Sequence, residues 1–250
     1  MRVRVRLRRL ATQYGLQAGI IAVGAALAAG QVGQSAYLTR TPVVQSVMER
    51  AKSPRFAVGR LGTAESGNLA ELDAGMEHPT IAKWVTKLAS APGFDRLLEK
   101  KAQYEPMITA KLDAKQMPRD LIYLAMIESE FNPNAKSRVK AVGMWQFMAP
   151  TARQFGLKVR GKVDERRDPE LATEAALTYL ASLKERFGSW YLAAAAYNSG
   201  AGTVRSALRR TTGRTTGTDA DFFRIMPKLP KETRDYVPKL IAAARVGNDP

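Results

Sequence analysis

From His78 onward, apolar residues recur three and four positions apart, and no alternating apolar and polar run is long enough for a β-strand. The segment IAKWVTKLA is an example: its apolar residues with this spacing are Ile81, Trp84, Val85 and Leu88. Residues at these intervals share one face of an α-helix, so each such segment predicts a helix with one buried side. The sequence therefore predicts a nearly all-α fold after residue 78.

Several of these helices carry recognisable ends. The segment DPELATEAALTYLASLKERFG has Asp168 as N-cap, Pro169 in the first turn and Gly188 after the last turn. A final helix is predicted from about Pro230, broken or entered at its prolines. The polar run RRTTGRTTGTDAD, which precedes it, predicts a flexible surface loop.

The N-terminus has a different pattern. Five of the first ten residues are arginines, and Ala11–Thr39 contains no charged residue. A basic head followed by an apolar stretch, Leu16–Gly30, is typical of an export signal, and the length also suits an uncleaved membrane anchor. We expect a signal peptide or anchor in residues 1–40, a linker in 41–77 and a catalytic domain in 78–250. The protein would then be periplasmic or held at the cell envelope.

Composition excludes several kinds of site. The chain has no cysteine, which rules out disulfides, thiolate metal ligands and cysteine nucleophiles. A single histidine, His78, excludes multi-histidine metal sites and most hydrolase triads. We expect no metal and no cofactor.

The formal net charge of +16 attracts polyanions, either nucleic acid or an envelope rich in carboxylate and phosphate. Charge alone does not choose between these partners. The sequence contains no nucleic-acid-binding motif, and the expected export signal argues against a nucleic-acid partner.

One carboxyl stands out on an apolar helix face. Leu121, Leu124, Ala125 and Glu128 lie at i, i+3, i+4 and i+7, so Glu128 falls on the buried stripe of its helix. Burial disfavours a carboxylate and raises its pKa, as a general acid requires near neutral pH. The alternative is a glutamate at a helix end that bonds the loop backbone, and the helix alone leaves both open.

The segments that follow resemble the lytic transglycosylases with a lysozyme-like, goose-type catalytic domain. The resemblance covers roughly residues 78–245 and looks closest to the membrane-bound D branch. Its specificity lies in the ordered set of motifs. These are Glu128-Ser129, Ser137, Gly143-Met144-Trp145-Gln146, Pro150-Thr151-Ala152, Tyr197-Asn198-Ser199-Gly200 and Glu232-Thr233-Arg234-Asp235-Tyr236-Val237.

The resemblance implies that Glu128 is the catalytic acid and base, with Tyr197 presenting a hydroxyl toward it. Each binding role also has a structural alternative: a core position for Tyr197, an ordinary loop amide for Gln146, a turn cap for Ser137, a turn support for Asn198 and a helix cap for Glu232. The residues that the resemblance assigns to substrate binding are Ser137, Gln146, Tyr197, Asn198 and Glu232.

The implied reaction is cleavage of the β-1,4 bond between N-acetylmuramic acid and N-acetylglucosamine in peptidoglycan, with closure of a 1,6-anhydro ring. The partner would be the peptidoglycan glycan strand, met at the inner membrane or envelope. Two alternatives remain: a goose-type lysozyme-like hydrolase that uses water, and an inactive peptidoglycan-binding scaffold. The Glu128-Ser129 pair argues against the scaffold.

Overall fold

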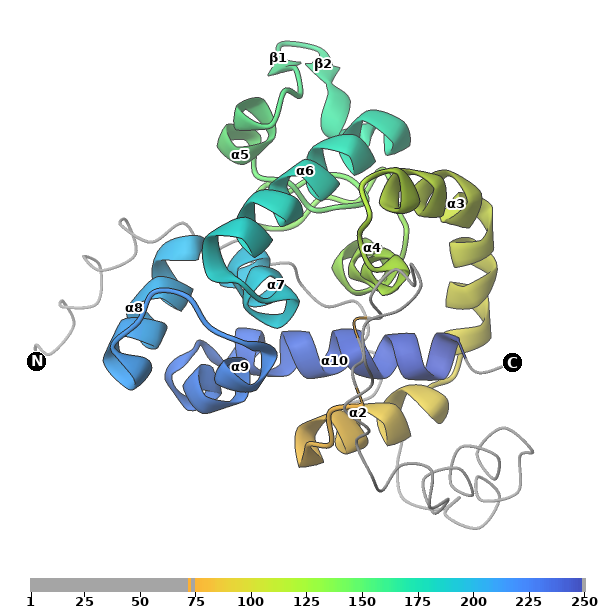
Figure 1. Ribbon diagram of the computed structural model, residues 1–250. Helices are drawn as coiled ribbons and strands as arrows, with labels where there is room; N and C mark the ends of the chain where they lie inside the picture. The colour runs from red at the N-terminus through yellow and green to blue at the C-terminus, as the bar shows by residue number, and fades with distance from the viewer. Residues whose placement is uncertain (1–71, 73–74, 249–250) are drawn as a thin grey trace, which may run out of the picture.

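The computed structural model describes residue 72 and residues 75–248 (Figure 1). Helices dominate this part of the chain, which confirms the mainly α prediction. The elements in chain order are α2 (Pro79–Ala89), α3 (Phe94–Ala114), η3 (Arg119–Leu121), α4 (Ile122–Ser129), α5 (Ala149–Gln154), β1 (Val159–Arg160), β2 (Val163–Asp164), η4 (Glu165–Arg167), α6 (Pro169–Phe187), α7 (Trp190–Ser199), α8 (Ala201–Thr212), α9 (Asp219–Ile225), η5 (Met226–Lys228) and α10 (Lys231–Gly247).

The predicted signal or anchor lies outside the described residues, as does most of the predicted linker. None of the helices between residues 75 and 248 has both the length and the apolar character that crossing a bilayer requires. Leu72 is buried in the core, and its N–H donates to the Asp120 carboxylate over 3.2 Å. The domain boundary at residue 78 stays a prediction.

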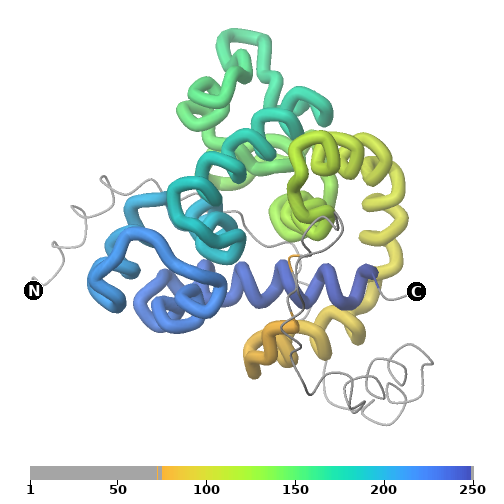
Figure 2. Tube along the Cα trace, viewed as in Figure 1, coloured from red at the N-terminus to blue at the C-terminus, as the bar shows by residue number. Residues whose placement is uncertain are grey.

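Two helices organise the core. α7 is enclosed along its length, since every residue from Tyr191 to Ser199 is buried. The Ala-rich sequence of α7 lets neighbouring helices approach closely, and it packs on α6, α8, α9 and α10. α10 crosses the molecule with α2 on one side and α4 and α7 on the other (Figures 1 and 2). This arrangement brings the end of α4 against the middle of α10.

Both predicted ends of α6 and the predicted start of α10 are confirmed. The Asp168 carboxylate accepts from two backbone N–H groups of α6, each over 2.9 Å, and Gly188 is the C-cap. α10 begins directly after Pro230 and continues without interruption through Pro238.

The predicted loop RRTTGRTTGTDAD is shorter than expected. α8 continues to Thr212, because its apolar face (Val204, Ala207 and Leu208) keeps the helix on the core. α9 already begins at Asp219, where Thr218 and Asp221 form a capping box. Only residues 213–218 lie between the two helices.

Two short strands, β1 and β2, were not predicted; they pair antiparallel with Val159 opposite Asp164. Each strand has two residues, too few to show an alternating pattern. The hairpin projects at the outer end of the molecule, next to α5 and the start of α6 (Figure 1).

Candidate active site

Glu128 lies in the last turn of α4, a helix that ends abruptly. The two residues after Ser129, Glu130 and Phe131, have φ angles of 56° and 58°, in the left-handed region that non-glycine residues rarely adopt. Such a conformation costs on the order of 1–3 kcal/mol per residue and persists where the surroundings hold it. Here the N–H of Glu130 donates to Met126 and that of Phe131 to Ala125. The chain therefore turns away directly behind Glu128.

The Glu128 carboxyl is buried, with 7% of the residue exposed, as its place on the apolar stripe predicted. The Tyr236 hydroxyl donates to Glu128 Oε1 over 2.6 Å. Burial raises the pKa of Glu128 to about 7, the Tyr236 hydrogen bond opposes this rise, Glu232 adds to it and Lys239 opposes it. A carboxyl that is partly protonated near neutral pH can both donate and accept a proton, which is what general acid–base catalysis requires.

Sequence reasoning did not single out Tyr236, the residue that donates the hydrogen bond to Glu128. It lies within the Glu-Thr-x-x-Tyr-Val motif, four residues after Glu232 and therefore on the same face of α10. This four-residue spacing was the sequence signal that could have pointed to Tyr236. Its partner is 108 positions earlier in the chain, and the sequence alone does not show which helix faces α10.

Tyr197, which the resemblance placed toward the glutamate, is buried. Burial raises the pKa of the Tyr197 hydroxyl, and the charge of Glu128 raises it further. The hydroxyl donates to the backbone carbonyl of Trp145 over 2.8 Å. Tyr197 thus anchors the loop that carries Gln146, while Tyr236 makes the hydrogen bond to the acid.

Residues 143–147, hereafter the Gln146 loop, are fixed from four sides. Besides Tyr197, the Ser129 hydroxyl at the end of α4 donates to the Met144 carbonyl over 2.8 Å. The Trp145 indole N–H donates to the Thr173 hydroxyl of α6 over 2.9 Å. The Ser129 bond ties the loop to α4, the helix that carries the acid, so the loop and the acid keep a fixed relative position.

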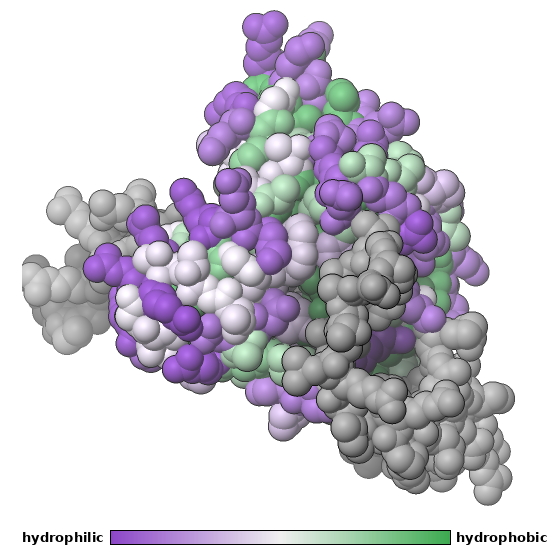
Figure 3. Space-filling model, viewed as in Figure 1, coloured by the Kyte–Doolittle hydropathy of each residue, from purple (hydrophilic) through white to green (hydrophobic). Residues whose placement is uncertain are grey.

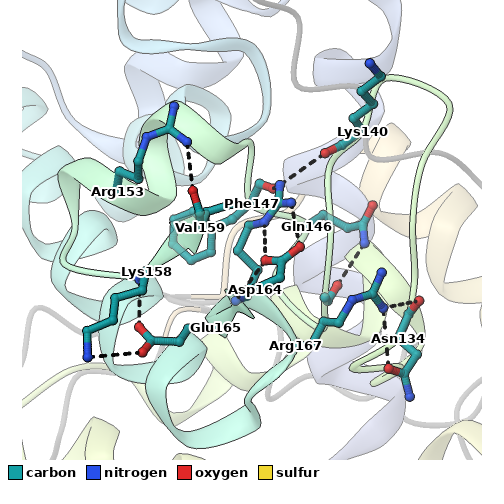
Figure 4. Close-up of polar contacts among 12 residues, drawn as sticks. Asn134, Lys140, Gln146, Phe147, Arg153, Lys158, Val159, Asp164, Glu165 and Arg167 are labelled. Carbon is teal, nitrogen blue, oxygen red and sulfur yellow. Dashed lines mark hydrogen bonds and ion pairs between the residues drawn. The ribbon is translucent and has the colours of Figure 1, made fainter. Parts of the chain in front are cut away.

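The fourth attachment comes from a buried arginine after β2. The Arg166 guanidinium donates to the carbonyls of Lys140 and Phe147, over 3.2 and 3.0 Å, and pairs with Asp164 (Figure 4). One charged group therefore joins the hairpin, the 137–141 turn and the Gln146 loop.

Gly143 and Gln146 give this loop its shape. Gly143 has φ +87°, and a Cβ there would lie 1.8 Å from the Arg166 carbonyl oxygen, so only glycine fits. Gln146 is buried with φ 48°, and its side-chain amide donates to the Gly143 carbonyl over 2.8 Å (Figure 4). Among residues 75–248, none donates a hydrogen bond to the amide oxygen of Gln146, which is free to accept one.

Asn198 and Glu232 connect α7 to α10. The Asn198 amide donates to Glu232 Oε1 over 3.3 Å, and its oxygen accepts from the Thr233 hydroxyl over 2.8 Å. Burial raises the pKa of Glu232, against the Asn198 hydrogen bond. Glu232 lies in the first turn of α10 and makes no capping bond there. This favours a role for Glu232 toward the site over the helix-cap alternative.

Ser137 lies in a different environment. Its half-buried hydroxyl accepts from the Ala141 N–H over 3.0 Å within its own turn, as the turn-cap alternative describes. That bond leaves the hydroxyl hydrogen available. Substrate contact by Ser137 stays a prediction, as it does for the other four residues.

Between residues 75 and 248, no three His, Asp or Glu side chains converge to hold a metal ion.

Residues 105–219 match the family model described as "Transglycosylase SLT domain". The chain is 36% identical over 173 residues to membrane-bound lytic murein transglycosylase D of Escherichia coli (strain K12), an alignment that covers 62% of this chain and 37% of the relative. It is 30% identical over 146 residues to soluble lytic murein transglycosylase of the same strain, covering 56% and 22%.

Among solved structures, the 70 kDa soluble lytic transglycosylase from Escherichia coli superposes with a TM-score of 0.52 at 25% identity, over 68% of this chain and 29% of that one. The chain thus matches 37% of the length of the first of these curated relatives and 22% of the second. The similarity confirms the predicted resemblance and the fold of the helical domain.

Proposed function

We propose that this chain is a peptidoglycan lytic transglycosylase that cleaves the β-1,4 bond between N-acetylmuramic acid and N-acetylglucosamine. The match of residues 105–219 to the transglycosylase SLT domain model supports this proposal. The observation that carries the proposal is the buried Glu128 carboxyl, with a pKa of about 7 and a 2.6 Å hydrogen bond from Tyr236. Two relatives at 30% and 36% identity, both named lytic murein transglycosylases, support it.

In the first step, protonated Glu128 gives its proton to the glycosidic oxygen, and the bond from this oxygen to C1 of the muramoyl residue breaks. The oxygen leaves as the hydroxyl of N-acetylglucosamine. The N-acetyl oxygen of the muramoyl residue stabilises the positive charge that develops at C1. Tyr236 holds the Glu128 carboxyl in one orientation during this transfer.

In the second step, the Glu128 carboxylate takes the proton of the muramoyl C6 hydroxyl. The C6 oxygen attacks C1 and closes the 1,6-anhydro ring, which leaves Glu128 protonated for the next cycle. Water is neither consumed nor released. A pKa near the working pH suits both steps, since neither protonation state of Glu128 is strongly disfavoured.

The Gln146 loop and the start of α10 flank this acid and would position the sugar. The free amide oxygen of Gln146 suits an N–H or hydroxyl of the glycan. Tyr197, Asn198 and Glu232 are already fixed by hydrogen bonds within the protein. Such groups bind substrate with little loss of side-chain entropy.

The hydrolase alternative would need a base to activate water, and Glu232 is the carboxylate whose charge acts on Glu128. Its hydrogen bond to Asn198 and the names of the relatives make this the weaker candidate. An inactive scaffold would not need a buried carboxyl with a raised pKa at position 128, so Glu128 argues against the scaffold alternative.

The substrate implies a place at the cell envelope, and the basic, apolar N-terminal segment in residues 1–40 would provide export or anchoring. The predicted division into this segment, a linker in 41–77 and a catalytic domain in 78–250 is consistent with that arrangement. Nucleic acid is not expected as a partner.

A single substitution tests the role of Glu128. Glu128→Gln preserves shape and burial but removes the transferable proton, so turnover on purified peptidoglycan should fall by about 10² to 10⁴-fold or more. Glu185→Gln, on the exposed side of α6, is the matched control and should remain fully active. The assignment is wrong if the Glu128 variant is folded and retains more than about a tenth of the wild-type rate.

A further inference from the structure

Three polar side chains lie along one stripe of α10. Glu232, Tyr236 and Lys239 occupy positions i, i+4 and i+7, which share a helix face. The first accepts a hydrogen bond from Asn198, and the second donates one to Glu128. The third, Lys239, therefore lies on the side of α10 that faces the acid, one turn beyond Tyr236.

An aromatic side chain of α2 holds Lys239 in place. The Lys239 amine lies 5.6 Å from the centroid of the Trp84 ring. The Trp84 indole N–H donates to Asp235 Oδ1 over 3.4 Å, so the ring spans one turn of α10 between residues 235 and 239. The contact with the ring restricts the position of the amine and is itself favourable, since a cation is attracted to an indole face.

Lys239 is half-buried, and within residues 75–248 no carboxylate lies within 4.0 Å of its amine. Burial lowers the pKa of Lys239, Glu128 of α4 raises it, Lys87 of α2 lowers it and Glu130 at the end of α4 raises it. A partly desolvated cation without a contacting counter-ion is costly unless its charge is used. The carboxyl group that influences it most is that of Glu128.

The charged and titratable groups that act on Glu128 come from two of the helices around it, α10 and α7. From α10 these are Tyr236, Glu232 and Lys239, and from α7 Tyr197. Lys239 is the cation among them. Tyr236 and Lys239 favour the ionised carboxyl, while Glu232 disfavours it.

We propose that Lys239 is a positioning residue for Glu128: its ammonium group, held against Trp84, stabilises the carboxylate that Glu128 becomes after protonating the leaving oxygen. This inference rests on the proposed function for its catalytic meaning. Tyr236 fixes the orientation of the carboxyl, and Lys239 makes its ionised form accessible within the buried site. The second step depends on that form, because the carboxylate must take the proton of the C6 hydroxyl.

The direct test is a carbon-13 NMR titration of the glutamate carboxyl signals in the full chain, with the Glu128 signal identified by its loss in Glu128→Gln. Lys239→Met keeps the length and the contact with Trp84 but removes the charge. The titration midpoint of Glu128 should rise by about 0.5 pH unit or more. Lys239→Arg should restore a midpoint close to the wild-type value.

Lys87→Met is the matched control, since the Lys87 amine lies over the same Trp84 ring, 4.4 Å from its centroid. It should leave the Glu128 midpoint in place. An unchanged midpoint in Lys239→Met, or an equal rise in Lys87→Met, would overturn the inference. If Lys239→Met does not fold, as judged by circular dichroism, Lys239→Gln replaces it in the same comparison.

The pH profile of kcat/KM gives a second readout. Glu128 must enter the reaction protonated, so the alkaline limb of the profile should move to higher pH in Lys239→Met by the same amount as the NMR midpoint. A uniform loss of activity with an unmoved limb would mean a merely structural role. If the midpoint moves but no variant, nor the wild type, cleaves peptidoglycan, the proposed function fails while the electrostatic coupling stands.

Discussion

At the scale of single residues, the buried Glu128 carboxyl carries the proposed chemistry at the expense of folding stability. Its pKa rises from an ordinary value of 4.5 to about 7, because burial disfavours the charged form. The folded state therefore binds a proton that the unfolded state has already released between these values. The contribution of Glu128 to stability is complete below about pH 4.5 and is lost as the pH rises through about 7.

Glu128→Gln should therefore become more stable relative to the wild type as the pH rises, because an amide does not ionise. The difference in the free energy of unfolding should increase by about 3 kcal/mol between about pH 4.5 and pH 8. Urea unfolding of both proteins at the two pH values measures it. The same difference at both pH values would show that the carboxyl is not buried as described.

Residue patterns predicted Glu128 but not its partner. An acid on an apolar stripe is visible within one helix, since positions 121, 124, 125 and 128 establish the face. The hydrogen bond from Tyr236 depends on the packing of α10 against α4. The spacing of residues within one helix does not predict which distant helix it packs against. The role of Lys239 was hidden for the same reason.

At the scale of elements, the Gln146 loop is held by backbone contacts rather than by its own propensity. Ser129, Tyr197 and Arg166 each donate to one of its carbonyls. Gly143 allows the Arg166 backbone to pass close by. The shape of the loop, and with it the position of Gln146, depends on that approach.

Gly143→Ala should be strongly destabilising, because the added Cβ would meet a backbone oxygen at 1.8 Å in addition to the strain of φ +87°. We expect a loss of at least about 3 kcal/mol in the free energy of unfolding. Gly213→Ala is the control, since residue 213 has φ +72° with nothing within 4 Å of the new Cβ. It should lose only about 1 kcal/mol, the strain alone.

Denaturant unfolding of both variants separates the two effects. Equal losses would mean that the approach of Arg166 to Gly143 does not matter for stability. The fraction of Gly143→Ala protein that folds should also show lower turnover, because the Gln146 loop is displaced. Gly213→Ala should cleave peptidoglycan at the wild-type rate.

The elements were predicted well where periodicity or capping determines them. Asp168 and Pro169 mark the start of α6 in the sequence as in the structure. The two-residue strands and the extension of α8 to Thr212 were not predicted, because the first are too short to show a pattern and the second is stabilised by packing of Leu208.

At the scale of the whole molecule, the chain combines a net positive charge with a hydrophilic outer surface (Figure 3). Hydrophilic side chains cover the outer ends of the visible face, over the β1–β2 hairpin and over α8 (Figure 3). The net charge of +16 should attract a polyanion to the protein without any recognition of its sequence.

Binding to insoluble peptidoglycan should therefore weaken as salt rises, because interactions between exposed charges are screened over about 8 Å at physiological ionic strength. A component that salt does not remove should remain, owing to contacts around Glu128 and Gln146. Sedimentation assays at increasing salt, with duplex DNA as the comparison polymer, measure both components. Complete loss of peptidoglycan binding at moderate salt, with tighter binding of DNA, would make the basic surface the main binding feature.

The chemistry of the cleaved end tests the central claim most directly. Purified peptidoglycan is digested in water enriched in heavy oxygen, and the new muramoyl ends are identified by mass spectrometry. A lytic transglycosylase closes the ring with the C6 oxygen of the sugar, so the new ends should be one water lighter than reducing ends and carry no heavy oxygen. Reducing muramoyl ends labelled with heavy oxygen would show that water is the nucleophile and that the enzyme is a hydrolase.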